Sequence, residues 1–447
     1  MAITDPREII DKSGMTTAQV AVVVITVLLN AMDGFDILSI AFASPGIRAE
    51  WNLGPTGLGT VLSMELIGMA IGSVFLGGVA DKVGRRPTLF GCLIVMALGM
   101  LGATTASSPV QLSIWRIFTG LGIGGMLSAT NAVVGEFTNT KRRALSISLM
   151  VIGYPLGGGF GGLYASKLIG AYGWRSVFYF GATATILLLP AIYFLVPESV
   201  HWLARKQPAD ALNRINASLR RLGHSAIAAL PVIQSEDRKK SISDIFSPAL
   251  ISTTVIVTLS YFLHIVTFYF LLKWTPTIVA NMKFPPPEAG RVLAMANFGG
   301  AAGGLVFGLL TSRIGLKPLT IVILAFNAAA VAIFGRVPAD LATLTMLGMI
   351  VGFFGNAAVS GLYSIVAYGF PTHVRATGTG FVIGVGRGGA VLSPILAGFL
   401  FDSGAGLPTV AMIMGIGSLL AAGVLLFLKV GGNQPALSGQ KKPKFAA

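Results

Sequence analysis

Long apolar runs alternate with short polar connections along almost the whole of the 447-residue sequence. A helix that crosses a bilayer needs roughly 20 predominantly apolar residues. Twelve runs reach about that length, at residues 20–47, 58–80, 88–106, 109–137, 143–170, 174–197, 250–281, 289–311, 317–335, 340–369, 375–402 and 407–429. Backbone polar groups inside a bilayer must be satisfied within their own segment, so each run predicts a helix. The predicted fold class is an all-α polytopic membrane protein with twelve transmembrane helices.

One polar stretch, residues 198–249, is much longer than the other connections. It separates six predicted helices from the six that follow. We therefore predict an N-terminal six-helix half over residues 1–197, a cytoplasmic linker over 198–249, and a C-terminal six-helix half with a short cytoplasmic tail over 250–447. Within the linker, residues 209–222 have the composition of a short amphipathic helix at the membrane surface.

The formal net charge is +15, although only 11% of the residues are charged. Lys and Arg gather in alternate connections, around residues 82–86, 141–143 and 205–240. Cytoplasmic loops of membrane proteins carry such an excess. Both termini are therefore predicted to be cytoplasmic, with the chain in a bacterial-type inner (plasma) membrane. The excess of Lys and Arg then indicates how the chain is oriented in the membrane and provides contacts with anionic lipid. No nucleic-acid partner is expected.

The connection after the second run has a partial copy after the eighth. The first reads GGVADKVGRRP (Gly77–Pro87) and the second reads GLLTSRIGLKP (Gly308–Pro318). Matching connections at equivalent places indicate two halves related by a parallel repeat. A substrate would then bind between the halves near the midplane, and the halves would rock to alternate access to it.

The residue types in these connections suit a gate at the ends of helices. Glycines allow a tight turn and close backbone approach, and an aspartate can accept from helix amides or from an arginine. The predicted members of this gate are Gly77, Asp81, Gly84, Arg85, Arg86, Glu136, Ser312, Arg313 and Arg375. For Glu136 we expect a pair with Arg85, Arg142 or Arg143.

At this point the chain resembles a known family. The GGVADKVGRRP connection, its copy and RIFTGLGIGG (Arg116–Gly125) look like signatures of the major facilitator superfamily. PESVHWL (Pro197–Leu203) resembles a segment of sugar and organic-ion porters. DGFD (Asp33–Asp36) is similar to the first-helix signature of the aromatic acid:proton symporter family.

This resemblance implies proton-coupled uptake of an aromatic carboxylate, hydroxybenzoate-like, by alternating access. It also implies dependence on acids and arginines, here at Asp33, Asp36, Asp81, Arg116, Glu136, Arg375 and Arg387. The chain departs from the family at Ser312, where an acid is often found. A second-half gate that is weaker, or that depends on hydroxyl hydrogen bonds, is therefore expected.

Ionisable residues within the apolar runs are the predicted proton-coupling residues. A charge at the centre of a membrane helix costs roughly 2.5–3.5 kcal/mol on insertion scales, so each one suggests a function. Asp33 and Asp36 share a helix face, repulsion and burial favour a proton on one of them, and Gly34 permits a close neighbouring helix. Arg116 is expected to pair with one of these acids, as a switch or as a static pair. Glu65 is either a second protonation site or a neutral packed acid.

Arg387 lies mid-span between glycines, and its planar guanidinium suits a carboxylate. It is predicted to bind the substrate anion; the alternative is a partner for an acid or for helix carbonyl groups. Lys167, Lys273 and Asp402 lie near the predicted outer ends of their runs, where they are expected to extend toward the interface.

A benzoate-like ring needs apolar or aromatic walls with a few polar groups. Besides Arg387, the predicted substrate-binding residues are Phe35, Tyr154, Tyr261, His264, Asn356, Ser360 and Tyr363. His264 has an alternative role as a hydrogen-bonded wall residue.

The sequence contains no recognisable metal-ligand cluster and no nucleophile–base set. An enzyme, a cofactor and a metal site are therefore not expected. The expected partners are a small aromatic carboxylate, protons and the lipid bilayer, and the expected state is a monomer. Three alternatives stay open: export of aromatic acids, transport of a non-aromatic organic acid, and a receptor built on a transporter scaffold.

Overall fold

A computed structural model describes residues 5–76, 78–231, 242–371 and 374–428, without the side chains of Ile242, Ser312 and Ala376. Within these residues the structure contains helices and no strands. Twelve of the described helices are long and apolar enough to cross a membrane. The predicted fold class is therefore confirmed, and the twelve helices follow the twelve apolar runs.

The long helices fall into two sets of six along the chain. The first set is α2 (Thr17–Trp51), α3 (Pro55–Phe75), α5 (Arg85–Thr104), α6 (Pro109–Phe137), α7 (Arg143–Tyr172) and α8 (Arg175–Leu195). The second set is α11 (Ile251–Asn281), α12 (Pro286–Ile314), α13 (Leu316–Phe334), α14 (Leu341–Gly369), α15 (Arg375–Asp402) and α16 (Leu407–Leu426). The shorter elements are α1 (Pro6–Lys12), α4 (Val79–Val83), α9 (Val200–Lys206), α10 (Ala211–Arg221) and η1 (Ile242–Phe246).

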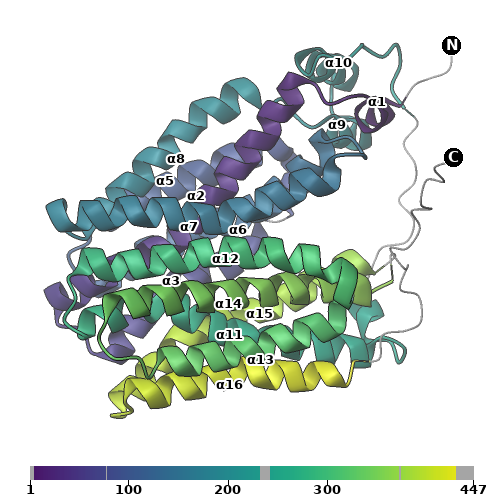
Figure 1. Cartoon of the computed structure of the whole chain (residues 1–447). Helices are drawn as coiled ribbons and strands as arrows, with labels where there is room; N and C mark the ends of the chain where they lie inside the picture. The colour runs from purple at the N-terminus through teal and green to yellow at the C-terminus, as the bar shows by residue number, and fades with distance from the viewer. Residues whose placement is uncertain (1–4, 77, 232–241, 372–373, 429–447) are drawn as a thin grey trace, which may run out of the picture.

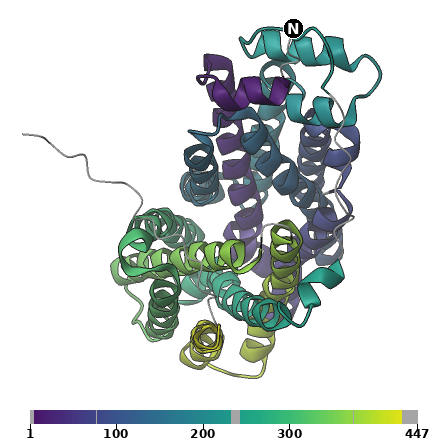
Figure 2. The same cartoon turned by 90° about the vertical axis from the view of Figure 1, so that its right-hand side faces the viewer.

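The two sets lie side by side as separate groups of helices (Figures 1 and 2). They meet mainly along three helix pairs, α2 with α11, α3 with α15, and α7 with α12. Helix α10 forms inside the segment predicted to be amphipathic, and it buries Ala211, Ile215 and Leu219. The boundaries of the two halves and of the linker stay a prediction.

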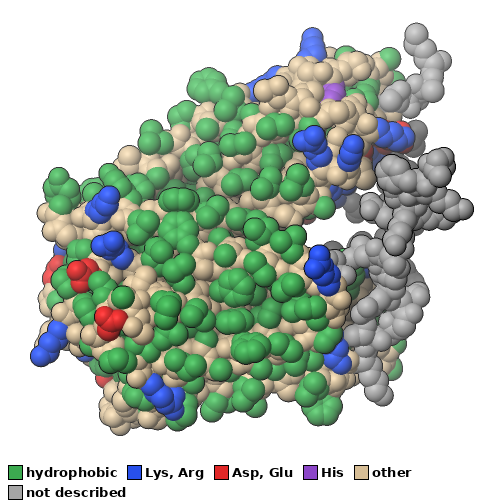
Figure 3. All heavy atoms as spheres, viewed as in Figure 1, with side chains coloured by type: hydrophobic (Ala, Val, Ile, Leu, Met, Phe, Trp, Pro, Cys, Tyr) green, Lys and Arg blue, Asp and Glu red, His purple; other side chains and the backbone are tan. Residues whose placement is uncertain are grey.

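Polar contacts join the halves at one end, which we name the closed end. Ser44 Oγ lies 2.7 Å from Thr277 Oγ1, and Arg48 donates to Asn281 Oδ1 at 2.7 Å. The opposite end carries α1, α9 and α10, and we name it the terminal end. Figure 3 shows the surface hollowed between the halves there. The halves therefore diverge from the closed end toward the terminal end.

Two glycines bring helices together in the first half. A Cβ on Gly34 in α2 would collide with the backbone oxygen of Tyr154 in α7. A Cβ on Gly120 in α6 would collide with the backbone oxygen of Glu65 in α3. Small residues permit such close approach between membrane helices. The close packing predicted at Gly34 is confirmed, and the two contacts set the distances between the charged residues described below.

Candidate functional site

Three charged side chains from both halves form a buried group, and we name Glu65, Arg116 and Lys273 the charge cluster. All three are fully buried. Glu65 in α3 forms an ion pair with Arg116 in α6, and its Oε2 lies 3.5 Å from Lys273 Nζ in α11. Lys273 also donates to the Ile37 carbonyl in α2. The charge cluster thus joins the two halves.

The expected pairing of Arg116 with Asp33 or Asp36 is wrong. The guanidinium pairs with the Glu65 carboxylate, and it reaches Asp36 only through the backbone carbonyl, 2.9 Å from Nη2. Its Nη1 contacts Met100 Sδ at 3.2 Å. The close approach of α3 to α6 places Glu65 opposite Arg116. Sequence periodicity gives the face of each helix but not which neighbouring helix that face meets.

The two aspartates of α2 are buried without partners. Asp33 and Asp36 have no exposed surface, and none of their four carboxyl oxygens has a hydrogen-bond partner in the described structure. Asp36 lies within electrostatic range of Arg116 and Glu65. One of its carboxyl oxygens faces Gly181 in α8. An unpartnered anion is costly to bury. Both acids are therefore suited to hold a proton.

Lys273 does not extend toward the interface as expected, whereas Asp402 is exposed at the end of α15. Lys273 lies eight residues before Asn281, the end of α11, which is about 12 Å along a helix axis. Asp402 accepts the Thr56 N–H at 2.9 Å and so joins α15 to α3. Lys167 is exposed. The position of a residue along a helix does not tell which face of the helix it occupies. Lys273 could have been identified as a candidate site residue in the same way as Glu65, because it is a charged residue inside an apolar run.

Arg387 of α15 reaches across to the first half. It is half-buried, and its Nη1 donates to the Met69 carbonyl in α3 at 3.2 Å. This contact matches the helix-carbonyl alternative. Met69 lies four residues after Glu65, about one helical turn nearer the terminal end. Arg387 is therefore close to the charge cluster, on the side where the halves diverge.

Tyrosines from both halves gather beside Arg387. Tyr261 in α11 donates to Tyr363 Oη in α14 at 3.2 Å, with ring centroids 5.5 Å apart. Tyr154 in α7 interacts across the halves with Tyr269 in α11. Arg387 lies within electrostatic range of Tyr261 and Tyr269. The structure thus brings three predicted tyrosines together with Tyr269, which the sequence reasoning missed among many similar aromatic residues.

Phe35 and His264 lie apart from this group. Phe35 packs edge to face against Phe180 in α8, with ring centroids 5.0 Å apart. His264 bonds through Nδ1 to Ser418 Oγ at 2.9 Å and through Nε2 to the Gly355 carbonyl at 3.2 Å. Both ring nitrogens are satisfied inside the second half. This arrangement favours the wall-residue alternative for His264.

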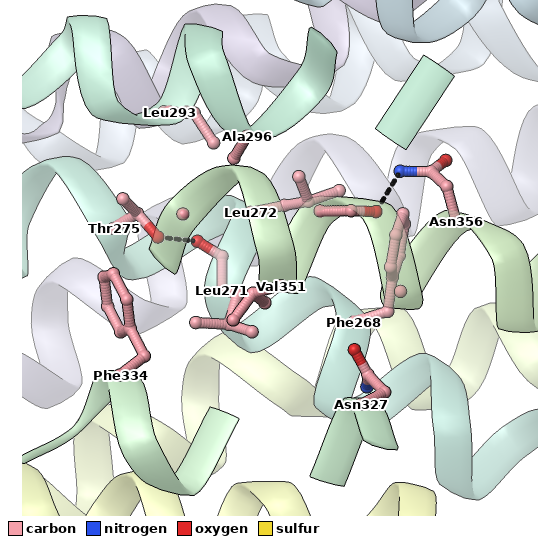
Figure 4. Close-up of a pocket in the computed structure, with 13 residues that line it drawn as sticks. Phe268, Leu271, Leu272, Thr275, Leu293, Ala296, Asn327, Phe334, Val351 and Asn356 are labelled. Atoms are coloured by element: carbon pink, nitrogen blue, oxygen red, sulfur yellow. Dashed lines mark hydrogen bonds between the residues drawn. The ribbon is translucent and has the colours of Figure 1, made fainter. Parts of the chain in front are cut away.

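A small cavity of about 20 Å³ lies inside the second half, lined by residues of α11, α12, α13 and α14. Figure 4 shows Asn356 bonded to its own helix at the Gly352 carbonyl, 3.3 Å away, and Thr275 bonded to the Leu271 carbonyl at 2.6 Å. Of the predicted binding residues only Asn356 lines this cavity; Ser360, one turn later, is half-buried. The lining contains no residue of the charge cluster, so the cavity is a separate feature.

Charged residues at the terminal end form a second network in the first half. Arg85 pairs with Glu136 Oε1 at 2.7 Å and with Asp81 Oδ1 at 2.8 Å. Arg205 also pairs with Asp81, at 2.7 Å. The pairing predicted between Glu136 and an arginine is confirmed. Glu198 accepts the Arg85 backbone N–H at 2.8 Å and caps α5. The sequence reasoning missed this contact, although Glu198 lies in the PESVHWL segment that it singled out.

Two further members of the predicted gate lie in the same turn. Gly84 has a φ of +118°, which an L-residue avoids, so the turn between α4 and α5 requires glycine. Arg86 donates to the Tyr193 carbonyl at the end of α8, at 2.6 Å. Gly77 lies outside the described residues.

The corresponding residues of the second half make weaker contacts. Arg375 donates to the Phe370 carbonyl at 3.3 Å, and Arg313 is exposed. The side chain of Ser312 lies outside the described residues. No acid partner is seen for Arg375 or Arg313 in the described part of the chain, in keeping with the weaker gate expected in this half.

Comparison with known proteins gives consistent matches over most of the chain. The sequence profile of the Major Facilitator Superfamily matches residues 24–285 and 250–446. A gallate transporter of Pseudomonas putida is 28% identical over 426 residues, 94% of each chain. The 4-hydroxybenzoate transporter PcaK of Pseudomonas putida is 29% identical over 396 residues, 87% of each chain. A benzoate transport protein of Acinetobacter baylyi is 27% identical, covering 89% of this chain and 86% of that protein.

Solved structures agree with the architecture. A crystal structure of a D-xylose-proton symporter superposes with a TM-score of 0.72 at 18% identity, covering 91% of this chain and 97% of that one. The xylose transporter XylE from E. coli, in an inward-open conformation, gives 0.72 at 17% identity, covering 92% and 96%. These likenesses concern the fold alone.

Proposed function

The chain belongs to the Major Facilitator Superfamily, and we propose that it imports an aromatic carboxylate together with protons by alternating access. As a member of this superfamily the chain is a multi-pass membrane transporter and not an enzyme. The relatives named for gallate, 4-hydroxybenzoate and benzoate cover most of both chains. They support a hydroxybenzoate-like substrate for this chain.

One observation carries the proton-coupled part of the proposal. The four unpartnered carboxyl oxygens of Asp33 and Asp36 lie in a fully buried region that also holds the Glu65–Arg116 ion pair. A carboxylate without a partner is costly to bury as an anion, and protonation removes that cost. In this proposal Asp36, which lies within electrostatic range of Arg116, takes up and releases the transported proton.

The substrate is proposed to bind where the halves diverge. Arg387 is a permanently charged fork that can hold a carboxylate bidentately, and its present partner is a neutral carbonyl. Tyr261 lies within electrostatic range of Arg387. Tyr363, which bonds to Tyr261, and Tyr154, which interacts with Tyr269, offer further ring faces and hydroxyl groups. Such a mixture of aromatic walls and a few polar groups suits a hydroxylated benzoate.

The orientation is proposed from charge. Basic residues gather at the terminal end, including Arg85, Arg86 and Arg205, which supports a cytoplasmic location for that end. Both termini then lie in the cytoplasm of a bacterial-type inner membrane, and the closed end faces outward. The protein is proposed to act as a monomer, because each chain contains both halves of the site.

The test is uptake of labelled 4-hydroxybenzoate into proteoliposomes with an imposed proton gradient. We expect accumulation that collapses when an uncoupler is added. Benzoate, gallate and a non-aromatic acid such as succinate would be run in parallel to separate an aromatic from a general organic-acid carrier. If none of the aromatic acids accumulates, the proposal is wrong; gradient-driven efflux alone would indicate the exporter alternative.

A further inference from the structure

The transport mechanism proposed above assigns no role to Lys273, a charged residue of α11. Within the described part of the chain it is the one Lys or Arg of the second half that is fully buried. A single ammonium group in the interior of a membrane protein is costly, and such residues face a partner or a substrate pathway. Packing alone would be served equally well by an apolar residue of similar length.

The face on which Lys273 lies is the face that meets the first half. Lys273, Thr277 and Asn281 follow one another at intervals of four residues, so they lie along one side of α11. Their partners in α2 are, in order, Ile37, Ser44 and Arg48. Lys273 is thus the innermost member of a polar seam between the halves, at the depth of the charge cluster.

The contact between Lys273 and its acid is loose. Lys273 Nζ lies 3.5 Å from Glu65 Oε2, whereas charge-assisted N–H···O bonds are typically about 2.7–2.9 Å. The other Glu65 oxygen is engaged by Arg116. Glu65 therefore neutralises Arg116 closely and Lys273 only in part. A second carboxylate could replace Glu65 beside Lys273 without breaking the Glu65–Arg116 pair.

A count of charges shows why that second carboxylate would arrive with protons. With Asp33 and Asp36 both protonated, Glu65 contributes one negative charge and Arg116 and Lys273 contribute two positive charges. The buried group then has one uncompensated positive charge. One ionised aspartate removes this excess, and so does one substrate carboxylate. Both together would leave an excess negative charge, which a low-dielectric interior disfavours.

We propose that Lys273 binds the substrate carboxylate, which replaces Glu65 as its partner at a mid-membrane site between the halves. The inference rests on the proposed transport of an aromatic carboxylate and assigns the counter-charge for that anion. Arg387 lies nearer the terminal end and meets the anion there, and Lys273 holds it at depth. Because the substrate carboxylate then compensates the charge of Lys273 in place of an ionised aspartate, anion binding favours protonated Asp33 and Asp36, which couples the two fluxes.

The experiment compares an acid with its uncharged amide. Affinities of the purified full-length protein for 4-hydroxybenzoate and 4-hydroxybenzamide are measured by calorimetry for wild type, Lys273→Met, Lys273→Arg and Lys167→Met. Loss of one charge-assisted contact is worth about ten-fold or more in affinity. We expect the acid-to-amide preference to fall by that factor in Lys273→Met and to survive in Lys273→Arg. It should be unchanged in Lys167→Met, which removes an exposed lysine.

Each outcome decides the inference. An unchanged acid-to-amide preference in Lys273→Met overturns it, while wild-type uptake leaves the proposed function standing. Failure of the wild type to bind or transport any aromatic acid overturns the proposed function, and this inference with it. If Lys273→Met does not fold, the same ratio measured on Lys273→Gln decides, since that side chain is polar but uncharged.

Discussion

Asp33 and Asp36 have the same chemistry and lie three residues apart, yet the structure gives them different surroundings. Asp36 is within electrostatic range of Arg116 and Glu65. Asp33 instead lies near Cys92 in α5. A charge beside a carboxyl group changes how readily it releases a proton. The acid next to the charge cluster is therefore the better candidate for a proton that must leave during each cycle.

Substitution of Asp36 by Asn tests this assignment. The amide keeps the size of the side chain but cannot exchange a proton, so uptake against a gradient should fall to the level of the uncoupled wild type. Exchange of labelled for unlabelled substrate at equal concentrations should continue. Both rates are measured in proteoliposomes, with Asp36→Glu as the matched variant that keeps the acid. Normal accumulation by Asp36→Asn would remove this residue from the coupling mechanism.

Arg387 leads to a second prediction at this scale. Arg387→Lys replaces a bidentate fork by a point charge, which should raise the transport KM for 4-hydroxybenzoate about ten-fold. The maximal rate should change less, because the positive charge is retained. Initial uptake rates over a range of substrate concentrations give both values. An unchanged KM would indicate that Arg387 serves only its contact with the Met69 carbonyl.

At the scale of elements, the position of the site depends on how closely helices approach. Gly34 lets α2 contact α7, and Gly120 lets α6 contact α3. The second contact places Arg116 beside Glu65 and away from the aspartates. In membrane helices such contacts arise from small residues and van der Waals packing, since lipid supplies no hydrophobic drive between helices.

Gly34→Ala is predicted to destabilise the protein, because its methyl group would collide with backbone atoms of Tyr154 that cannot rotate away. Overpacking of this kind typically costs about 1–3 kcal/mol. Gly91→Ala in α5 is the matched control, since a Cβ there meets nothing within 4 Å. That change should be neutral or stabilising, by up to about 1 kcal/mol. Thermal unfolding midpoints in detergent compare the two; equal midpoints would show that α2 and α7 can separate at no cost.

At the scale of the whole molecule, the two halves are joined at the closed end and diverge at the terminal end. An apolar cluster with residues of both halves, Ile47 and Ile278 among them, packs at the closed end, and the polar contacts there include the Ser44–Thr277 pair at 2.7 Å. The polar contacts can be broken and replaced by water at a modest cost. Alternating access requires that this end open while the terminal end closes.

A reversible crosslink across the closed end should therefore stop transport. Ser44→Cys with Thr277→Cys, in a Cys92→Ser background that removes the one native cysteine, places two thiols where the hydroxyl oxygens are 2.7 Å apart. Oxidation should abolish uptake, and reduction should restore it. The two single-cysteine variants under the same oxidant are the controls. Undiminished uptake by the crosslinked protein would mean that the closed end does not open during transport.

The sequence by itself determined the class of fold and the main chemical groups. Twelve apolar runs could form only helices in a bilayer, because lipid leaves the backbone no other hydrogen-bond partners. The matching connections at 77–87 and 308–318 predicted the repeat, and the acids of α2 were identified as unusual by their cost in an apolar run. The Arg85–Glu136 pair could also be predicted, since both residues lie at helix ends on the same side.

Only the tertiary structure decided which charges meet inside the membrane-spanning part of the protein. Arg116 pairs with Glu65 rather than with Asp33 or Asp36, and Lys273 turns inward to the first half instead of toward the interface. Helical periodicity fixes the face on which a side chain lies, but not the rotation of one helix against another or the depth at which two helices touch. Those quantities are set by the glycine contacts and by the seam between the halves. Tertiary packing therefore determines which buried acid and which buried cation can exchange partners.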